Sequence, residues 1–182
     1  MNSAILRPRT AVISGAPGSG KTALLFTLAR RGFRVVDEAA RAILREPGGM
    51  ALRADDPLAF AKAMFAREMA DLESVADDRR WTIFDRGLAD SVGFLRLSGI
   101  AVPAEMARWP AQIRYSGPVF LAPAWARIYR GDAERIQDWD QAVASGEAVA
   151  AAWRDAGHNP IDLPQIAPEE RADFVQSCLT EA

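Results

Sequence analysis

Cysteine and long hydrophobic runs are nearly absent from this chain of 182 residues. Cys178 is the single cysteine, which excludes an intramolecular disulfide framework and a zinc site built from cysteines. No stretch reaches the roughly 18 consecutive apolar residues that can span a bilayer. The apolar run Ala11–Ile13 is also too short for the hydrophobic segment of a signal peptide. We therefore expect a cytoplasmic protein with no membrane span and no membrane partner.

A surplus of charge of one sign is missing too. The 22 Lys and Arg residues and the 24 Asp and Glu residues leave a formal net charge of −2. Proteins that bind nucleic acid usually carry a basic patch or an overall basic charge. We therefore expect no nucleic-acid partner. Lysine is scarce, since only Lys21 and Lys62 are present, and we attribute this to genomic base composition.

Short apolar segments alternate with amphipathic ones along the chain. The length and an apolar content of 49% fit a single domain, residues 1–182, with a substantial core. The alternation predicts a three-layer α/β/α fold with a mostly parallel sheet of about five strands. Strands are expected at Thr10–Ser14, Phe33–Val36, Trp81–Asp85, Pro118–Ala122 and Ile161–Leu163. Helices are expected at Ala23–Arg31, from Glu38 to Arg45, and at Asp56–Asp77, Leu88–Leu97, Pro103–Trp109, Asp132–Ala156 and Pro168–Leu179.

The first expected strand leads into the pattern G-x-x-x-x-G-K-T, which is typical of a P-loop when a strand precedes it and a helix follows. The glycines let backbone N–H groups turn toward phosphate oxygens, and the positive end of the helix dipole points at the same anion. The lysine reaches the β- and γ-phosphates, and the threonine hydroxyl can ligate Mg²⁺. The sequence therefore predicts a site for ATP and Mg²⁺, and the alternative is a glycine-rich turn without a ligand. The pattern consists of Gly15, Ala16, Pro17, Gly18, Ser19, Gly20, Lys21 and Thr22.

An acidic and a basic residue close the third expected strand. Asp85 follows the apolar pair Ile83-Phe84 and is itself followed by Arg86. A carboxylate at this position can hold Mg²⁺ or take a proton from an attacking hydroxyl. Arg86 would then steady a phosphate or a substrate oxygen. The alternative is that Asp85 caps the next helix and pairs locally with Arg86.

The second expected strand also ends in acidic residues, Asp37 and Glu38. Successive side chains of a strand point in opposite directions, so only one of the two faces the γ-phosphate, and we favour Glu38. Glu38 would act as general base toward a substrate hydroxyl. Arg41 lies on the same helical face as Glu38, where it either holds the substrate or forms a local ion pair.

Several arginines follow the fourth expected strand. Arg127, Arg130 and Arg135 alternate with tyrosine and acidic residues. Arginines on a segment that closes over a triphosphate stabilise the charge of the transferring phosphoryl group. We expect this role for Arg130 and Arg135, and the alternative is a solvated helix start with weak ion pairs.

Five stretches of the chain together resemble a family of small bacterial P-loop proteins that are described as AAA-type ATPases or kinases. The stretches are GAPGSGKT, VVDEAAR, IFDRGLAD, VFLAPAW and IYRGDAERIQD, and the resemblance extends from Arg9 to Leu179. The family is similar to the nicotinamide-riboside kinase domain and, more distantly, to nucleoside and nucleotide kinases such as thymidylate kinase. The resemblance implies a P-loop kinase core.

The resemblance also implies roles for single residues. Lys21 and Thr22 would take phosphates and Mg²⁺, and Glu38 would activate or bind the substrate hydroxyl. Asp85 and Arg86 match the D-R pair of the family's active site.

Further expectations from the resemblance concern the acceptor pocket and the lid. Asp90 would face the acceptor, and a helical lid would occupy residues 123–138. The lid arginines do not match the R-x-R-x-x-E spacing of deoxynucleoside kinases. Related kinases often dimerise through helices, so a homodimer is one candidate assembly, and the sequence leaves the oligomeric state open.

These features predict an ATP- and Mg²⁺-dependent phosphotransferase that moves the γ-phosphoryl group to a small-molecule acceptor, with nucleosides and nucleotides among the candidates. One alternative is a regulatory switch that binds and hydrolyses ATP without such an acceptor. The N-K-x-D motif of guanine-specific switches is absent around Lys62, which disfavours GTP. Another alternative shares the chemistry and inactivates a small toxic compound.

Overall fold

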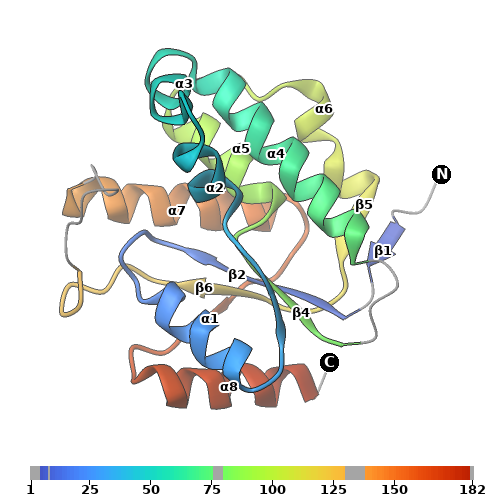
Figure 1. Cartoon of the computed structure of the whole chain (residues 1–182), viewed down its shortest axis with the longest axis vertical. Helices are drawn as coiled ribbons and strands as arrows, with labels where there is room; N and C mark the ends of the chain where they lie inside the picture. Colours follow the sequence, from blue (N-terminus) through green and yellow to red (C-terminus); the bar gives the residue numbers. More distant parts are fainter. Residues whose placement is uncertain (1–4, 8, 76–79, 130–137, 181–182) are drawn as a thin grey trace.

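The computed structural model of the chain describes residues 5–7, 9–75, 80–129 and 138–180. Its centre is a five-stranded sheet in which every neighbouring pair of strands is parallel (Figure 1). The strands follow the order β3 (Arg34–Val36), β4 (Thr82–Asp85), β2 (Thr10–Gly15), β6 (Val119–Ala122) and β7 (Ile161–Asp162). The strand that leads into the P-loop is therefore central, with β4 and β6 on either side.

Helices cover both faces of the sheet (Figure 1). One face packs against α1 (Lys21–Arg30) and α8 (Pro168–Thr180). The other packs against α4 (Pro57–Ser74), α5 (Leu88–Leu97) and α7 (Trp139–Asp155). Shorter helices, α2 (Ala39–Arg45), α3 (Gly49–Asp55) and α6 (Ala104–Ala107), and a 3₁₀ turn (Trp109–Ala111) complete the layer around α4. No helix in the described residues is long and apolar enough to cross a membrane.

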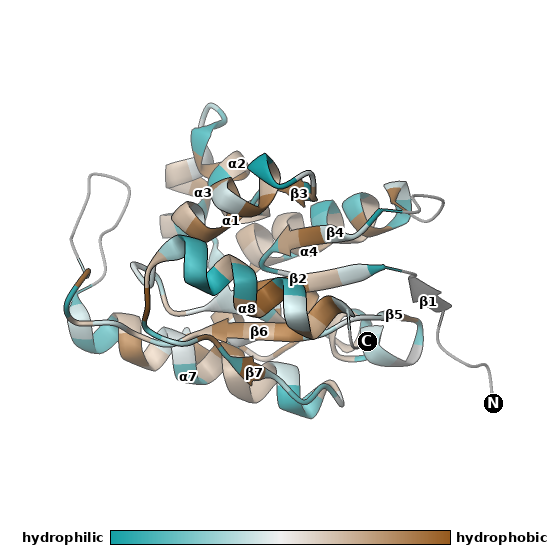
Figure 2. Cartoon of the chain, turned by 90° about the horizontal axis from the view of Figure 1, so that it is seen from below, coloured by the Kyte–Doolittle hydropathy of each residue, from teal (hydrophilic) through white to brown (hydrophobic). Residues whose placement is uncertain are grey.

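The apolar runs of the sequence form the strands because both faces of the sheet are covered. Every residue of β2 and β6 is buried, as continuous apolar strands of parallel sheets require. Figure 2 shows that the strands are among the most apolar segments, whereas the helices also carry hydrophilic residues. The three-layer α/β/α fold expected from the sequence is confirmed.

The structure contains elements that the sequence did not predict. β1 (Ile5–Arg7) and β5 (Ile113–Tyr115) form a separate parallel pair, and three-residue strands are too short to show a periodicity. α3 lies between two expected helices, where no element was expected, and begins at Gly49 because Gly48 has a φ of 82° and turns the chain into a new helix. Residues 130–137 of the expected lid lie outside the described residues, and 126–128 form a turn.

α5 and α7 pack closely because the residue of α5 that faces α7 is a glycine, Gly93. A Cβ atom at Gly93 would lie 2.9 Å from the Cα of Val149 on α7. Val149 is buried in the same apolar cluster as Trp153 and Leu88. The close approach holds α7 near the P-loop, since a Cβ at Gly146 would lie 3.1 Å from that of Ala16.

We expect Gly93→Val to lower the free energy of unfolding by about 1–3 kcal/mol, because the added side chain forces two packed helix backbones apart. Leu97→Val, at an exposed position of the same helix, is the matched control and should change it by less than about 0.5 kcal/mol. Urea unfolding followed by circular dichroism gives both values. Equal stability of the two variants would contradict the close approach of α5 and α7.

Candidate active site

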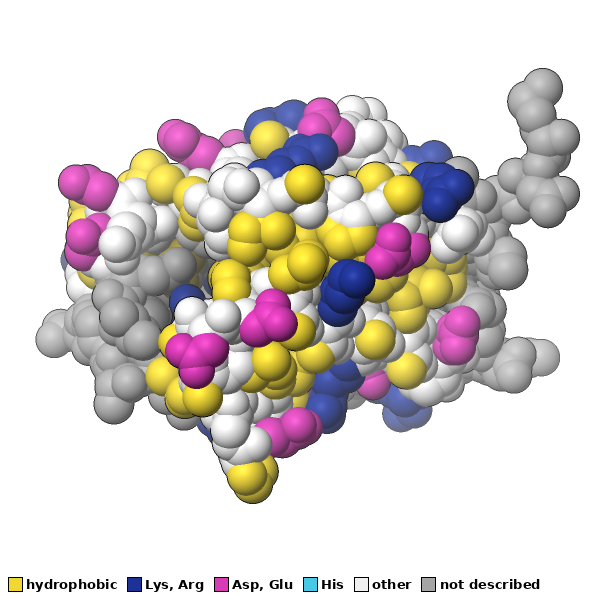
Figure 3. Space-filling model, turned by 90° about the horizontal axis from the view of Figure 1, so that it is seen from above, with side chains coloured by type: hydrophobic (Ala, Val, Ile, Leu, Met, Phe, Trp, Pro, Cys, Tyr) yellow, Lys and Arg dark blue, Asp and Glu magenta, His cyan; other side chains and the backbone are white. Residues whose placement is uncertain are grey.

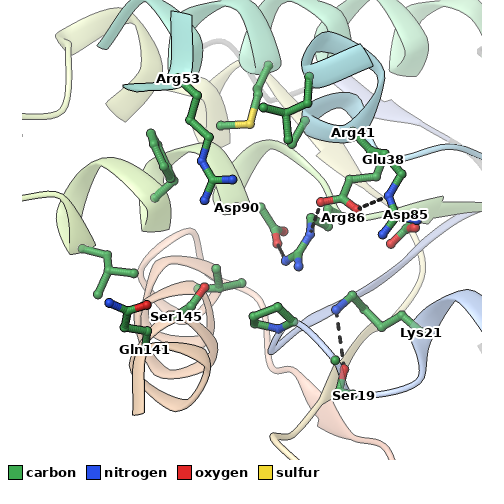
Figure 4. Close-up of a pocket in the computed structure, with 18 of the residues that line it drawn as sticks. Ser19, Lys21, Glu38, Arg41, Arg53, Asp85, Arg86, Asp90, Gln141 and Ser145 are labelled. Carbon is green, nitrogen blue, oxygen red and sulfur yellow. Dashed lines mark hydrogen bonds and ion pairs between the residues drawn. The ribbon is translucent and has the colours of Figure 1, made fainter. Parts of the chain in front are cut away.

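A cavity of about 870 Å³ lies at the carboxyl ends of the strands. Ligands of open parallel sheets bind at the carboxyl ends of the strands, in the crevice where the strand order reverses. The P-loop forms one side of the cavity, and residues of α2, α3, α4, α5 and α7 line much of the remainder, together with the end of β4 (Figure 4). Met50 and Leu97, two large apolar side chains that stay exposed, line the cavity as well. Figure 3 shows the surface from the side of α3, where apolar side chains gather between scattered charged ones.

The P-loop has the backbone conformation that its glycines permit. Gly15, Gly18 and Gly20 have φ values of 112°, 72° and 82°, which side chains with a Cβ rarely adopt. A Cβ atom at Gly15 would lie 2.3 Å from the carbonyl oxygen of Ala122 on β6. The Ser19 hydroxyl donates a hydrogen bond of 2.7 Å to the carbonyl oxygen of Ala16 and closes the loop.

Lys21 lies inside this loop, where the residue is only 7% exposed. Its Nζ donates a hydrogen bond of 2.6 Å to the carbonyl oxygen of Ala16. Burial, together with the charge of Arg86, lowers the pKa of Lys21 to about 7 despite the raising effect of Asp85, Glu38 and Asp90. A bound triphosphate would supply the negative charge that restores the ammonium.

Arg86 is the centre of a buried ion network. Its Nε donates to Oε1 of Glu38 at 2.9 Å, and its Nη1 donates to Oδ1 of Asp90 at 2.8 Å and to the carbonyl oxygen of Gly15 at 3.0 Å. Burial opposes the charge of Arg86, but the surrounding carboxylates raise the pKa of its guanidinium above the usual value. With a φ of 72°, the backbone of Arg86 lies in the left-handed region. The network therefore holds a strained residue in place.

Asp90 accepts hydrogen bonds from four groups. Its Oδ1 accepts from Arg86 and, at 2.6 Å, from the hydroxyl of Ser14 on β2. Its Oδ2 accepts from the indole Nε1 of Trp153 on α7 at 3.1 Å and from the backbone N–H of Gly87 at 3.2 Å. Asp90 lines the cavity as expected. Both carboxylate oxygens of Asp90 accept hydrogen bonds from protein groups, so Asp90 positions Arg86.

Asp85 lies beside this network, but its carboxylate does not share the hydrogen bonds that Glu38 and Asp90 make. Its Oδ1 is buried and accepts no hydrogen bond from the part of the chain that the structure describes. Burial, together with the charge of Glu38, raises the pKa of Asp85 to about 6 despite the lowering effect of Lys21, Arg86 and Arg41. A carboxylate oxygen without a partner beside a P-loop is suited to accept a hard cation.

The residues present fit Mg²⁺. Thr22 and Asp85 line the same cavity, and the magnesium ion of a P-loop protein takes its other ligands from water and the nucleotide. Among the described residues, no cluster of three or more His, Cys, Asp and Glu side chains could hold a metal by itself. The ion would therefore depend on a bound nucleotide.

Glu38 directly precedes α2 and points its carboxylate at Arg86 (Figure 4). Its Oε2 lies 3.6 Å from the Nε of Arg41. Burial would raise the pKa of Glu38, but the charges of Arg86, Lys21 and Arg41 outweigh it and lower the pKa below its usual value. Glu38 is therefore ionised at neutral pH, and Arg41 joins the cavity through the expected local pair.

The structure thus brings together most of the predicted site residues. Every P-loop residue from Pro17 to Thr22 lines the cavity, as do Glu38, Arg41, Asp85, Arg86 and Asp90. Arg127 is exposed on the described turn after β6. Arg130 and Arg135 lie outside the described residues, so their role in a lid stays a prediction.

Sequence reasoning missed two buried charged residues. Glu68 on α4 lines the cavity and accepts a hydrogen bond of 3.1 Å from Ser91, and burial raises the pKa of its carboxyl well above the usual value. Arg171 on α8 is 2% exposed and donates to the carbonyl oxygen of Ser19 at 2.9 Å, with its guanidinium over the ring of Trp125. Both residues follow the four-residue spacing of a buried helix face, which was the available signal.

Comparisons with known proteins agree with this geometry. The family described as AAA domain matches residues 10–171, and no curated protein matches the chain. The structure of deoxyadenosine kinase from M. mycoides with bound dATP has a TM-score of 0.71 at 11% identity, with 94% of this chain and 99% of that chain covered. Thymidylate kinase from Candida albicans has a TM-score of 0.69 at 10% identity, with 96% of this chain and 92% of that chain covered.

The NadR protein in complex with NR is similar as well, with a TM-score of 0.71 at 16% identity over 96% of this chain and 52% of that chain. At these identities the likeness shows a shared fold. The fold class expected from the sequence, a P-loop NTPase of the nucleoside and nucleotide kinase type, is confirmed.

We expect Asp90→Asn to lower the free energy of unfolding by about 3 kcal/mol, because it leaves the buried guanidinium of Arg86 without one of its charged partners. Asp155→Asn is the matched control, since Asp155 pairs with Arg96 at 2.6 Å on the surface, and should cost less than about 1 kcal/mol. Chemical denaturation measures both. A cost for Asp90→Asn no larger than that of the control would contradict the buried network.

Binding of ATP should be coupled to proton uptake at Lys21. Because the pKa of Lys21 is about 7 without ligand, the amine is mostly neutral at pH 8, and a triphosphate that raises the pKa draws in up to about one proton. Calorimetry at pH 8 in two buffers with different ionisation enthalpies measures this uptake. Lys21→Arg keeps the charge and should abolish the uptake, and an uptake that persists in this variant would exclude Lys21 as its source.

Proposed function

The chain belongs to the AAA domain family that matches residues 10–171, and from this premise we propose that it is an ATP- and Mg²⁺-dependent phosphotransferase. The acceptor of the γ-phosphoryl group is a small molecule. The observation that carries the proposal is the cavity itself, which extends from the P-loop past Asp85 and Glu38 to an apolar region between α3, α4 and α5. A P-loop that only binds and hydrolyses a nucleotide has no need for this additional volume.

In the proposed reaction, an acceptor oxygen attacks the γ-phosphorus of ATP while the bond between this phosphorus and the β–γ bridging oxygen breaks. ADP leaves, and the proton of the attacking hydroxyl passes to Glu38. Glu38 suits this step because Arg86 keeps it ionised. Lys21 neutralises charge on the β- and γ-phosphates, and Arg130 and Arg135 add charge from the expected lid.

Thr22 and Asp85 are the proposed holders of Mg²⁺. When bound, the ion neutralises charge on the phosphates that the reaction redistributes. Arg86 and Asp90 position the groups around it, since both bind the protein rather than the open cavity.

Production of ADP from Mg-ATP, alone and with a panel of acceptors, tests the proposal. The panel holds nucleosides, nucleoside monophosphates, nicotinamide riboside and hydroxylated antibiotics. We expect one class to stimulate ADP production strongly. Slow hydrolysis that no compound stimulates, together with tight ATP binding, would contradict the proposal and support the regulatory switch.

Two variants test the assigned residues. Lys21→Ala should abolish ATP turnover, because the positive charge that faces the phosphates is lost. Asp85→Asn should slow transfer roughly a hundredfold or more, because the negative charge that would hold Mg²⁺ is lost. Circular dichroism checks that both variants fold, and Asp155→Asn serves as a surface control. An Asp85→Asn variant as active as the control would assign Asp85 a structural role only.

A further inference from the structure

Arg171 is a buried cation that the proposed reaction does not use. It lies on α8, which packs beside α1 on one face of the sheet (Figure 1). Its side chain is buried and does not line the cavity. Arginine is almost never buried to this extent unless a carboxylate pairs with it, so the position of Arg171 requires an explanation.

The guanidinium of Arg171 has one hydrogen-bond acceptor in the part of the chain that the structure describes. Its Nη1 donates to the carbonyl oxygen of Ser19 in the P-loop at 2.9 Å. Its Nε and Nη2 are buried and have no hydrogen-bond partner there. The ring of Trp125 covers the group, with its centroid 5.7 Å from Cζ of Arg171. Buried donors without acceptors are rare in proteins, so a specific role is expected.

The acidic residues of α8 do not neutralise this cation. Glu169 and Asp173 pair with Arg31 at 3.0 and 2.7 Å, and Glu170 accepts from a backbone N–H at 3.1 Å. Burial lowers the pKa of the Arg171 guanidinium, but arginine stays charged at neutral pH. A buried charge without a partner is costly. A bound phosphate chain on the other side of the loop would supply the missing negative charge.

The hydrogen bond from Arg171 fixes the peptide unit that joins Ser19 to Gly20. This peptide is trans, so its carbonyl oxygen and its N–H point in opposite directions. Ser19 and Gly20 line the cavity and Arg171 does not, so the oxygen is held on the side of the loop away from the cavity. The N–H of Gly20 is therefore turned toward the cavity, and it donates no hydrogen bond within the described residues.

Arg171 also limits the room around Gly20. A Cβ atom at Gly20 would lie 3.1 Å from Nη1 of Arg171 and 3.0 Å from Cδ1 of Ile128, in the turn after β6. These contacts hold the peptide in one orientation before a ligand is bound. A site that is already ordered loses less entropy when its ligand binds.

We propose that Arg171 is a positioning residue of the phosphate site, which turns the N–H of Gly20 toward the phosphates and adds a positive charge behind the loop. The inference rests on the nucleotide binding that is part of the proposed function. The backbone N–H groups of a P-loop surround the α- and β-phosphates, which ATP and ADP share. A cation bonded to the carbonyl oxygen polarises the peptide and strengthens its N–H as a donor. Arg171 thus acts on the binding of both nucleotides rather than on transfer of the γ-phosphoryl group.

Calorimetry with Mg-ATP and Mg-ADP tests the inference. Arg171→Met removes the charge and the donor, while an unbranched apolar side chain still fills the buried position. We expect it to raise the Kd of ATP and the Kd of ADP by the same factor, roughly ten- to a hundredfold. Arg171→Lys keeps a charge and a donor, and should recover most of the affinity. Unchanged Kd values in Arg171→Met would overturn the inference.

Arg31→Met is the matched control, because Arg31 joins α1 to α8 through Glu169 and Asp173. It also removes a guanidinium between these helices, but not one that bonds to the P-loop. We expect it to unfold at a lower denaturant concentration and to bind ATP and ADP as the wild-type protein does. Equal losses of affinity in Arg31→Met and Arg171→Met would assign the effect to the packing of α8 and overturn the inference.

Nuclear magnetic resonance of the ¹⁵N-labelled wild-type protein gives a test that does not depend on the folding of a variant. Addition of Mg-ADP should move the amide signal of Gly20 and slow its exchange with solvent, because the N–H gains a phosphate acceptor. The Nε–H signal of Arg171 should move as well, because the phosphate charge acts across the loop. An unmoved signal of either group would overturn the inference.

Steady-state kinetics separates the inference from the proposed function. With an acceptor that is phosphorylated, Arg171→Met should raise the KM of ATP and leave kcat within roughly threefold of the wild-type value. A large fall in kcat at unchanged KM would overturn the inference. If no acceptor is phosphorylated, the proposed function fails, and weaker ADP binding by Arg171→Met still supports the inference. Wild-type protein that binds neither nucleotide would contradict both.

Discussion

The guanidinium of Arg86 is the interaction on which the site depends. It joins the end of β3 through Glu38, the start of α5 through Asp90, and the P-loop through the carbonyl oxygen of Gly15. These three segments are far apart in the sequence and meet only at the carboxyl edge of the sheet. One buried cation therefore fixes their relative positions. The left-handed backbone of Arg86, which most side chains avoid, persists because the surrounding contacts determine it.

The same network divides the charged groups of the cavity into two kinds. Arg86 keeps Glu38 ionised and Asp90 is fully hydrogen-bonded, whereas Lys21 and Asp85 are pushed by burial toward their neutral forms. The second pair lacks the partners that a metal-bound triphosphate would provide. The ligand-free protein is thus electrostatically incomplete at the P-loop, which explains why ligand binding and protonation are coupled there.

Sequence patterns predicted the sheet and the P-loop because both depend on neighbours in the chain. An apolar run, a glycine pattern and a helix start are local signals, and so is the four-residue spacing that places Glu68 on a buried helix face. The pairing of Arg86 with Glu38 and with the carbonyl oxygen of Gly15 was not predictable in this way, because it depends on distances between separate strand ends. Helix α3 was missed for another reason, since a seven-residue segment that begins directly after Gly48 is too short to show a clear helical periodicity.

The central claim is that the γ-phosphoryl group moves to a small molecule and not to water. The most direct measurement follows the label of γ-³²P-ATP during turnover with the panel of acceptors and separates organic phosphate from inorganic phosphate. The account predicts that the label appears in an organic phosphate, in a quantity equal to the ADP produced. Label that appears only as inorganic phosphate, at the same rate with and without acceptors, would contradict it.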